Sequence, residues 1–238
     1  MKAVIAAAGK GTRMKHLTKN KPKPLIEIQK KPFLAYLLDN ILKAGYKEII
    51  LIVGYKEEKI REFLKKYQYK VKVINQYKIL GENEYGTLSA LKCLKKILTS
   101  ENFVMVYGDN LYSVKDLKSF KINDNYHYLA GIFHPHPEKY GVIISDNDGF
   151  LKKIVEKPKK FVGNLINTGL YKFSPEIFKK ISKISLSPRG EYELTDALNL
   201  LAKEKKVKVK EIQDYWFDFG NPADIIKLSR FFKKKRRL

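Results

Sequence analysis

A glycine loop, two basic side chains and two widely separated aspartates are the residues of this chain that could do chemistry together. The loop Gly9-Lys10-Gly11-Thr12-Arg13 follows an apolar run, and backbone N–H groups at glycines can approach anionic oxygens closely. Asp109 and Asp218 each follow an apolar run, and two carboxylates can share a cation. Phosphate contacts, positive charge and a shared cation are the parts of an enzyme that uses a nucleotide.

The loop taken alone is a weak signal. It lacks the Lys-Ser/Thr ending of the Walker motif and the third glycine of the dinucleotide fingerprint, so a plain strand-to-helix turn remains an alternative. Lys23 strengthens the phosphate interpretation, since Pro22 and Pro24 restrict the backbone on both sides and predict a stiff extended segment. A lysine that merely solvates a loop is the alternative for Lys23.

The elements that would position these residues alternate along the first half of the chain. The patterns predict strands at residues 2–8, 48–53, 70–74 and 103–107, and helices at residues 32–44, 57–67 and 87–98. This order predicts an α/β fold, in which a mostly parallel sheet carries helices on both faces.

After Asp109 the pattern changes to short extended segments. Strands are predicted at residues 128–133, 141–145, 151–155, 170–173 and 207–212, and helices at residues 175–181 and 194–202. The strands would cover a substrate. No repeat or low-complexity linker marks a boundary, so we predict one domain over residues 1–238, made of two halves, 1–112 and 113–238.

Composition narrows the class of protein. Apolar residues make up 44% of the chain, which is enough for a sizeable core, and no apolar run is long enough to span a bilayer. Cys93 is the lone cysteine, and no signal-like segment opens the chain, so a cytoplasmic protein is expected. The oligomeric state is left open, and a homo-oligomer is among the states that the sequence allows.

The net charge of +23 could attract phosphates, nucleic acid or an acidic membrane, or could simply reflect a lysine-rich, soluble surface. The basic tail, residues 233–238, follows Phe231 and Phe232 and could be a nucleic-acid or membrane contact or a frayed, solvated helix end. No nucleic-acid partner is expected, because the 15 tyrosines are scattered through apolar runs rather than interleaved with basic residues.

Eight motifs, in order, resemble those of the sugar-1-phosphate nucleotidylyltransferases, the family that includes glucose-1-phosphate thymidylyl- and uridylyltransferases and mannose-1-phosphate guanylyltransferases. They cover nearly the whole chain: Ala7-Ala8-Gly9-Lys10-Gly11-Thr12-Arg13-Met14, Pro22-Lys23-Pro24-Leu25, Tyr107-Gly108-Asp109-Asn110, Tyr140-Gly141-Val142, Glu156-Lys157-Pro158, Asn167-Thr168-Gly169-Leu170-Tyr171, Gly190-Glu191-Tyr192-Glu193-Leu194-Thr195-Asp196 and Trp216-Phe217-Asp218-Phe219-Gly220.

The resemblance implies a Rossmann-like α/β/α fold with a mixed, mostly parallel sheet and a small sugar-binding insertion of strands. It also implies that a nucleoside triphosphate and a sugar 1-phosphate give a nucleotide sugar and pyrophosphate. UTP or dTTP, with glucose or N-acetylglucosamine 1-phosphate, are the favoured substrates. The attacking group is a phosphate oxygen, so no side-chain nucleophile is needed, and Mg²⁺ would neutralise charge.

The same resemblance implies residue roles. Arg13, Lys23 and Asp109 would be catalytic, and Asp109 and Asp218 would hold Mg²⁺. The nucleotide would be bound by Ala8, Gly9, Gly11, Thr12, Gln76, Gly86 and Thr87. The sugar phosphate would be bound in the half 113–238 by Gly141, Glu156, Lys157, Asn167, Glu191 and Trp216.

Two departures from the family pattern stand out. The segment from Gln76 to Gly86 is longer than in thymidylyltransferases and could alter base selection, and Asn199 stands where many of them carry a phosphate-binding Arg. The second half most resembles archaeal members, which often continue into an acetyltransferase β-helix. This chain ends at Leu238 without such repeats, so acetyl transfer is not expected.

Two other functions remain open. A cytidylyltransferase acting on a phosphorylated alcohol such as phosphocholine is the nearest enzyme, because residues 75–91 resemble that branch. A regulator that binds nucleotide sugar without turnover would normally have lost Arg13, Lys23, Asp109 or Asp218, and all four are present.

Overall fold

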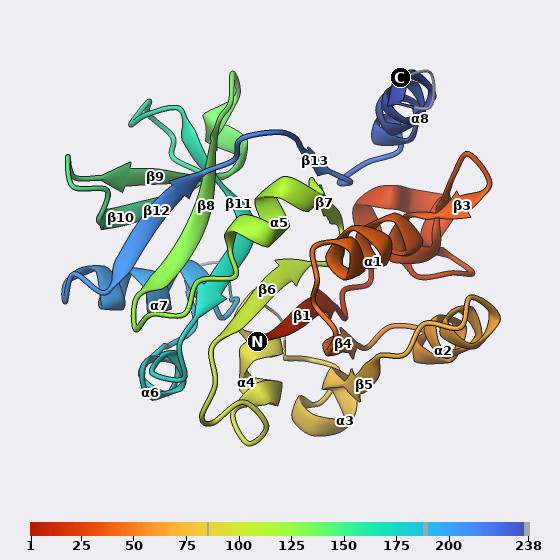
Figure 1. Ribbon diagram of the computed structural model, residues 1–238, viewed down its shortest axis with the longest axis horizontal. Helices are drawn as coiled ribbons and strands as arrows, with labels where there is room; N and C mark the ends of the chain where they lie inside the picture. Colours follow the sequence, from red (N-terminus) through yellow and green to blue (C-terminus); the bar gives the residue numbers. More distant parts are fainter. Residues whose placement is uncertain (85, 188–189, 236–238) are drawn as a thin grey trace.

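The computed structural model describes residues 1–84, 86–187 and 190–235. The strands of its central sheet are β1 (Lys2–Ala7), β4 (Ile49–Val53), β5 (Lys72–Asn75), β6 (Phe103–Tyr107), β8 (His127–Phe133), β9 (Gly141–Ser145), β10 (Leu151–Glu156), β11 (Leu165–Phe173) and β12 (Val207–Glu211). Among the described residues the order is β10-β9-β11-β6-β1-β4-β5, with β8 beside β11 and β12 beside β8 (Figure 1).

The first half supplies the parallel strands β6, β1, β4 and β5. Side chains of β1 alternate between two cores: Ile5 packs into one cluster and Val4 into the other. Both faces of these strands are therefore covered, which explains their continuous apolar sequences. The predicted mixed sheet with helices on both sides is confirmed.

Helices cover both faces of the central sheet (Figure 1). On one face lie α1 (Phe33–Lys43), α2 (Glu57–Lys66) and α5 (Val114–Ser119), and Leu228 of α8 (Ala223–Lys235) joins the same cluster. On the other face lie α4 (Ser89–Leu94), α6 (Ile177–Ile181) and α7 (Leu194–Ala202). The short α3 (Gln76–Leu80) follows β5 directly, and this places Gln76 at the carboxyl edge of the sheet.

The second half wraps around β11, which pairs antiparallel with β6, β8 and β9. Phe150, just before β10, forms a bridge to Lys208 of β12, and Val209 N donates to Gly149 O at 2.9 Å. The start of β10 therefore contacts β12, which itself pairs with β8, so the strands of the second half contact one another beside the parallel strands.

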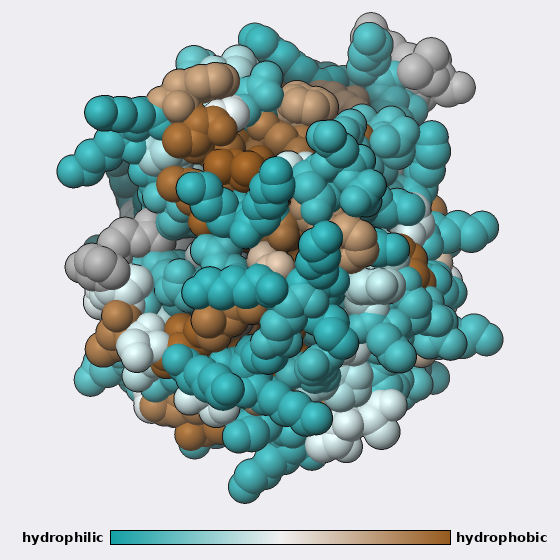
Figure 2. All heavy atoms as spheres, turned by 90° about the vertical axis from the view of Figure 1, so that its left-hand side faces the viewer, coloured by the Kyte–Doolittle hydropathy of each residue, from teal (hydrophilic) through white to brown (hydrophobic). Residues whose placement is uncertain are grey.

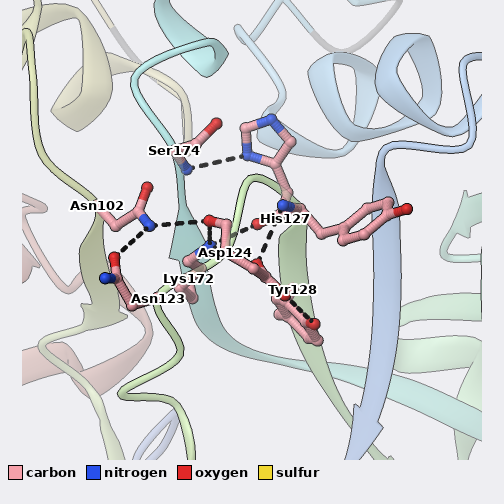
Figure 3. Close-up of polar contacts among 8 residues, drawn as sticks. Asn102, Asn123, Asp124, His127, Tyr128, Lys172 and Ser174 are labelled. Atoms are coloured by element: carbon pink, nitrogen blue, oxygen red, sulfur yellow. Dashed lines mark hydrogen bonds and ion pairs between the residues drawn. The ribbon is translucent and has the colours of Figure 1, made fainter.

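A buried polar cluster secures β11 to the loop before β8 (Figure 3). Lys172 has no exposed surface, and its Nζ donates to Asp124 O at 2.5 Å, Asp124 Oδ1 at 2.9 Å and Tyr126 O at 2.7 Å. Burial lowers the pKa of Lys172 despite the opposing effect of Asp124. His127 is also buried, and its Nδ1 accepts from Ser174 N at 3.3 Å.

Two small sheets stand outside the central one: β7 (Asn110–Tyr112) pairs with β13 (Trp216–Asp218), and β2 (Glu27–Ile28) pairs with β3 (Lys31–Pro32). The register of the first sets Asp218 opposite Asn110. This pairing brings the segments of the two distant aspartates together.

The aromatic pair that precedes the basic tail packs against the body of the protein. The ring of Phe232 stacks on Tyr36 with centroids 4.0 Å apart, and Phe231 lies 4.6 Å from Phe217. The two rings anchor helix α8, and both alternatives for the basic tail itself stay predictions. Of the tail 233–238, residues 236–238 lie outside the described residues.

Several predicted boundaries were wrong in detail. The helix predicted at 87–98 is the shorter α4, and the strand predicted at 170–173 is the end of the longer β11. Lys23 begins a 3-10 turn, Lys23–Leu25, where an extended segment was expected. The residues on either side of this turn, Pro22 and Ile26, are extended, and Pro22 has φ −67° and ψ 149°. Proline suits the first turn of a helix, so Pro24 is compatible with that turn.

Hydrophilic residues cover most of the face shown in Figure 2, and hydrophobic residues gather in its upper part and at its lower left. Exposed apolar side chains of the second half include Phe133 at the end of β8 and Phe161 and Val162 in the β10–β11 loop. Over residues 1–84, 86–187 and 190–235, no helix combines the length and apolarity needed to cross a membrane.

Candidate active site

A cavity of about 640 Å³ opens at the carboxyl ends of β1, β5 and β6, where ligands usually bind in open α/β sheets. Every site residue predicted from the sequence lines it. From the first half of the chain these are Ala8, Gly9, Gly11, Thr12, Arg13, Lys23, Gln76, Gly86, Thr87 and Asp109. From the second half they are Gly141, Glu156, Lys157, Asn167, Glu191, Trp216 and Asp218.

The glycine loop leaves β1 and turns at Gly11, which has φ +66°. A Cβ at this position would lie 2.8 Å from Lys23 Cβ, so glycine is needed for both the backbone conformation and the close approach. Thr18 Oγ1 donates to Gly11 O at 3.2 Å and holds the turn. The glycine loop therefore packs closely against Lys23.

Lys23 is the buried basic residue of the site, with 8% of its surface exposed. Its Nζ donates to Asp109 Oδ2 at 2.5 Å. Burial by itself would raise the pKa of Asp109, but the charges of Lys23 and Arg13 outweigh it and lower that pKa. The alternative in which Lys23 merely solvates a loop is therefore wrong.

Asp218 has the opposite electrostatic environment. Burial, followed by the nearby charge of Asp109, raises the pKa of Asp218 to about 6, although Lys23 and Arg13 act against this shift. The Tyr140 hydroxyl donates to Asp218 Oδ2 at 3.5 Å. A Cβ on Gly220 would lie 3.1 Å from Asp218 Oδ2 and 3.4 Å from Arg13 Nη1. The side chains of Arg13 and Asp218 therefore both lie next to this glycine.

The two carboxylates fit the protein's share of a magnesium site. In the part of the chain that the structure describes, no group of three or more His, Cys, Asp or Glu side chains gathers to hold a metal. Mg²⁺ usually takes one or two carboxylates and completes its shell with substrate phosphates and water. Burial, and after it the charge of Asp109, raises the pKa of Asp218, and a cation between the two carboxylates would offset both effects.

Trp216 contacts the cavity and also helps to position Asp109. Its Nε1 donates to Asn110 Oδ1 at 2.9 Å and to Thr168 O at 3.1 Å. Asn110 Nδ2 in turn donates to Asp109 Oδ1 at 3.1 Å. Because Lys23 bonds to the other oxygen of Asp109, both oxygens of this carboxylate have a donor.

The segment that follows β5 forms the wall next to the glycine loop. Gln76 is buried, and its Nε2 donates to Glu84 O at 3.3 Å. The Tyr77 hydroxyl donates to Ala8 O at 3.2 Å, which connects this wall to the end of β1. Thr87 Oγ1 accepts a hydrogen bond from Leu194 N at 2.8 Å.

The opposite wall comes from β9, β10 and β11. Gly141 pairs with Glu156, and a Cβ at Gly141 would lie 2.9 Å from Glu156 Oε2, so the missing side chain leaves room for this carboxylate. Asn167 Nδ2 donates to the Tyr171 hydroxyl at 2.7 Å. Lys157 follows β10 with φ +45°, an uncommon conformation for a residue other than glycine.

Asn199 has a structural role. Its Nδ2 donates to Ile154 O at 3.1 Å and its Oδ1 accepts from Ile154 N at 2.7 Å, so it bonds to the backbone of β10. It is not among the described residues that line the cavity, and it therefore does not take the place of the phosphate-binding Arg.

Other lining residues were not assigned as site residues from the sequence: Tyr77, Tyr107, Asn110, Tyr140, Tyr171, Glu193 and Thr195 are among them. Most stand inside or beside motifs that were recognised, as Tyr140 does before Gly141. Treating whole motifs as cavity lining would have included them, since a strand that ends at a site contributes successive residues.

Comparisons with known proteins agree with this geometry. The model of the nucleotidyl transferase family matches residues 2–235. The chain is 36% identical over 97% of its length to a "bifunctional sugar-1-phosphate nucleotidylyltransferase/acetyltransferase" of Sulfurisphaera tokodaii, and 37% identical over 99% to a "bifunctional protein GlmU" of Methanocaldococcus jannaschii. It spans 55% of each of these curated relatives.

The fold is also that of a UDP-glucose pyrophosphorylase solved with UDP-glucose, with a TM-score of 0.85 and 24% identity over 98% of both chains. At this identity the likeness concerns the fold alone. The family match, which covers nearly every described residue and the whole cavity, shows that the chain belongs to the nucleotidyl transferase family.

Proposed function

We propose that this protein transfers a nucleotidyl group from a nucleoside triphosphate to a hexose 1-phosphate and releases pyrophosphate. The observation that carries the proposal is the arrangement of Lys23, Asp109, Asp218 and Arg13 in one cavity, between a nucleotide-side wall and a second wall of polar groups. The names of the relatives, a sugar-1-phosphate nucleotidylyltransferase and GlmU proteins, support the same reaction.

In this reaction a phosphate oxygen of the sugar 1-phosphate attacks the α-phosphorus of the nucleotide. The new O–P bond forms as the bond between the α-phosphorus and the β-phosphate oxygen breaks, and pyrophosphate leaves with that electron pair. The chain's task is to align two anions and to stabilise the charge between them. Arg13 and Lys23 would supply positive charge, and the glycine-loop N–H groups would bind phosphate oxygens.

Asp109 and Asp218 are proposed to hold Mg²⁺, which when bound supplies charge neutralisation at the phosphates. Lys23 keeps Asp109 ionised and limits its movement. Trp216, acting through Asn110, orients the same carboxylate. These residues of the chain therefore prepare the oxygen ligands before substrate arrives.

Substrate roles follow the two walls. We assign the base to Gln76, Gly86 and Thr87, and the hexose and its phosphate to Gly141, Glu156, Lys157, Asn167 and Glu191. A buried amide can donate and accept, as a pyrimidine edge requires, which favours UTP or dTTP. Glucose 1-phosphate and N-acetylglucosamine 1-phosphate are the proposed acceptors.

The test is pyrophosphate release with Mg²⁺ over a grid of five nucleoside triphosphates. The acceptors are glucose, N-acetylglucosamine, galactose and mannose 1-phosphates and phosphocholine. Release with UTP or dTTP and a glucose-type phosphate is the expected result. Release only with CTP and phosphocholine would identify a cytidylyltransferase, and binding of nucleotide sugars with no turnover would identify a regulator.

A further inference from the structure

Two segments that are distant in sequence meet at the cavity. We call residues 81–84 and 86–88 the nucleotide loop, and residues 190–195 the sugar segment. Leu88 N donates to Tyr192 O at 3.0 Å, and Leu194 N donates to Thr87 Oγ1 at 2.8 Å. The loop belongs to the first half of the chain and the segment to the second, so these bonds join the two halves.

The contact between the nucleotide loop and the sugar segment is so close that residue 86 must be glycine. This residue has φ +127°, and a Cβ on it would lie 2.2 Å from Tyr192 O and 2.5 Å from Tyr192 N. A side chain at this position would therefore push the two segments apart. The glycine that lines the base side of the cavity also sets the position of the sugar segment.

Lys92, on α4, lies against both segments. It forms an ion pair with Glu84 of the nucleotide loop, and its Nζ lies 3.2 Å from the centre of the Tyr192 ring in the sugar segment. The side chain of Lys92 is 23% exposed. A partly buried ammonium between a carboxylate and an aromatic face interacts more strongly with each than it would in water.

Both partners of Lys92 continue to lining residues of the cavity. The backbone oxygen of Glu84 accepts from Gln76, the residue assigned to the base. Tyr192 lies between Glu191 and Glu193, which both line the sugar side. A displacement at either partner would therefore reach the cavity through a covalent neighbour or a single hydrogen bond.

We propose that Lys92 is a positioning residue that holds the sugar segment against the nucleotide loop. The position of the loop then determines the position of the sugar-side wall of the cavity. The proposal rests on the proposed function for its kinetic effects. Without Lys92 the sugar phosphate must order the wall as it binds, which costs affinity. Lys23 and Asp109 are fixed by other contacts, so the reacting groups keep their geometry.

The test compares Lys92→Met with Lys92→Arg and with Lys95→Met, a control at an exposed lysine on the following turn. At saturating nucleotide, Lys92→Met should raise the KM for the sugar 1-phosphate about tenfold and change kcat less than about threefold. Lys92→Arg should restore the KM to within about twofold, and Lys95→Met should leave it unchanged. Equal KM values in Lys92→Met and wild type, or an equal rise in Lys95→Met, would overturn the proposal.

A second measurement tests the contact without turnover. In the substrate-free protein, amide hydrogen exchange in residues 190–194 should be about tenfold faster in Lys92→Met than in wild type or Lys95→Met. Unchanged exchange would refute the positioning role even if the enzyme is active. If wild type turns over no substrate pair while exchange rises as expected, the proposed function fails and the role of Lys92 stands.

Discussion

The ammonium of Lys23 lies 2.5 Å from the carboxylate of Asp109, at a sequence separation of 86 residues. Both groups line the same cavity, and Lys23 lowers the pKa of Asp109 against the effect of burial. This pair joins the turn after the glycine loop to the end of β6, so each partner depends on the other for its position and its charge.

Replacing Lys23 should therefore reduce catalysis strongly. We expect Lys23→Ala to lower kcat/KM by roughly a hundredfold or more, the scale of losing one preorganised electrostatic contact. Steady-state pyrophosphate release measures this. Lys21→Ala, at an exposed lysine on the same segment, is the matched control and should keep normal activity. A loss below threefold in Lys23→Ala would remove Lys23 from the mechanism.

Asp218 is expected to contribute to activity and to lower the stability of the folded protein. Its pKa is raised to about 6, first by burial and then by Asp109, so the carboxylate that predominates at pH 7 is less stable in the folded protein than in the unfolded chain. Asp218→Asn should lose most activity, yet its free energy of unfolding should rise by roughly 1–3 kcal/mol, because the amide carries no charge to be buried beside Asp109. Urea denaturation measures the change, with the exposed Asp214→Asn as control. A clear loss of stability would contradict this account of Asp218.

Removal of divalent cations should stop turnover. Two carboxylates alone supply few ligands, so the cation would depend on substrate phosphates and should exchange readily. Activity should disappear in excess EDTA and return when Mg²⁺ is added beyond the chelator. Full activity in EDTA would exclude the assigned metal role of Asp109 and Asp218.

The buried His127 should make the fold sensitive to acid. Burial, with Lys172, Lys206 and Lys180 nearby and only Asp124 opposing them, lowers its pKa to about 3. An unfolded histidine titrates near 6.5, so the unfolded state binds the proton first, and stability falls as pH drops from about 6.5 to about 3. Above about pH 6.5 His127 is neutral in both states and causes no loss of stability.

When the pH falls from 7 to 5, the free energy of unfolding should decrease by about 2 kcal/mol because of this histidine. His127→Gln should remove that part of the pH dependence, whatever the stability of this variant at pH 7. The comparison is urea denaturation at both pH values, with the exposed His16→Gln as control. An equal pH dependence in His127→Gln and wild type would show that His127 is not the group responsible.

The basic tail should be dispensable for catalysis, whereas the aromatic pair before it should matter for stability. A chain that ends at Phe232 should keep its specific activity within about twofold, because none of the residues 233–235 lines the cavity. Phe232→Ala should lower the free energy of unfolding by roughly 1–3 kcal/mol, since it removes the ring stacked on Tyr36. A large loss of activity on truncation would place the tail at a substrate or a subunit contact.

The parallel half was predictable because its signals are local. An apolar strand covered on both faces and an amphipathic helix followed by a glycine each leave a pattern within about a dozen residues, as β1 and α1 do. The short β7 and β13 gave no such pattern. Their stability comes from pairing with each other across more than a hundred residues, which periodicity does not reveal.

The candidate site was predictable as a set of residues and much less so as a set of contacts. Family motifs indicated Arg13, Lys23 and Asp109, and all three line the cavity. The contacts of Lys92 with Glu84 and Tyr192 carry no local signal, because they depend on how the segments that hold Glu84 and Tyr192 fold against α4. Likewise, the pairing of the Phe231-Phe232 rings with the body depends on tertiary packing that composition alone does not encode.

The pairing of β13 with β7 has a consequence for the order in which the candidate site is assembled during synthesis. The glycine loop, Lys23 and Asp109 all precede Asp218 in the chain, and β7 is made more than a hundred residues before its partner β13. The parallel strands next to the glycine loop pair with one another rather than with β13. Under the proposed function, a nascent chain would therefore stay inactive until β13 has paired with β7 and brought Asp218 to the site.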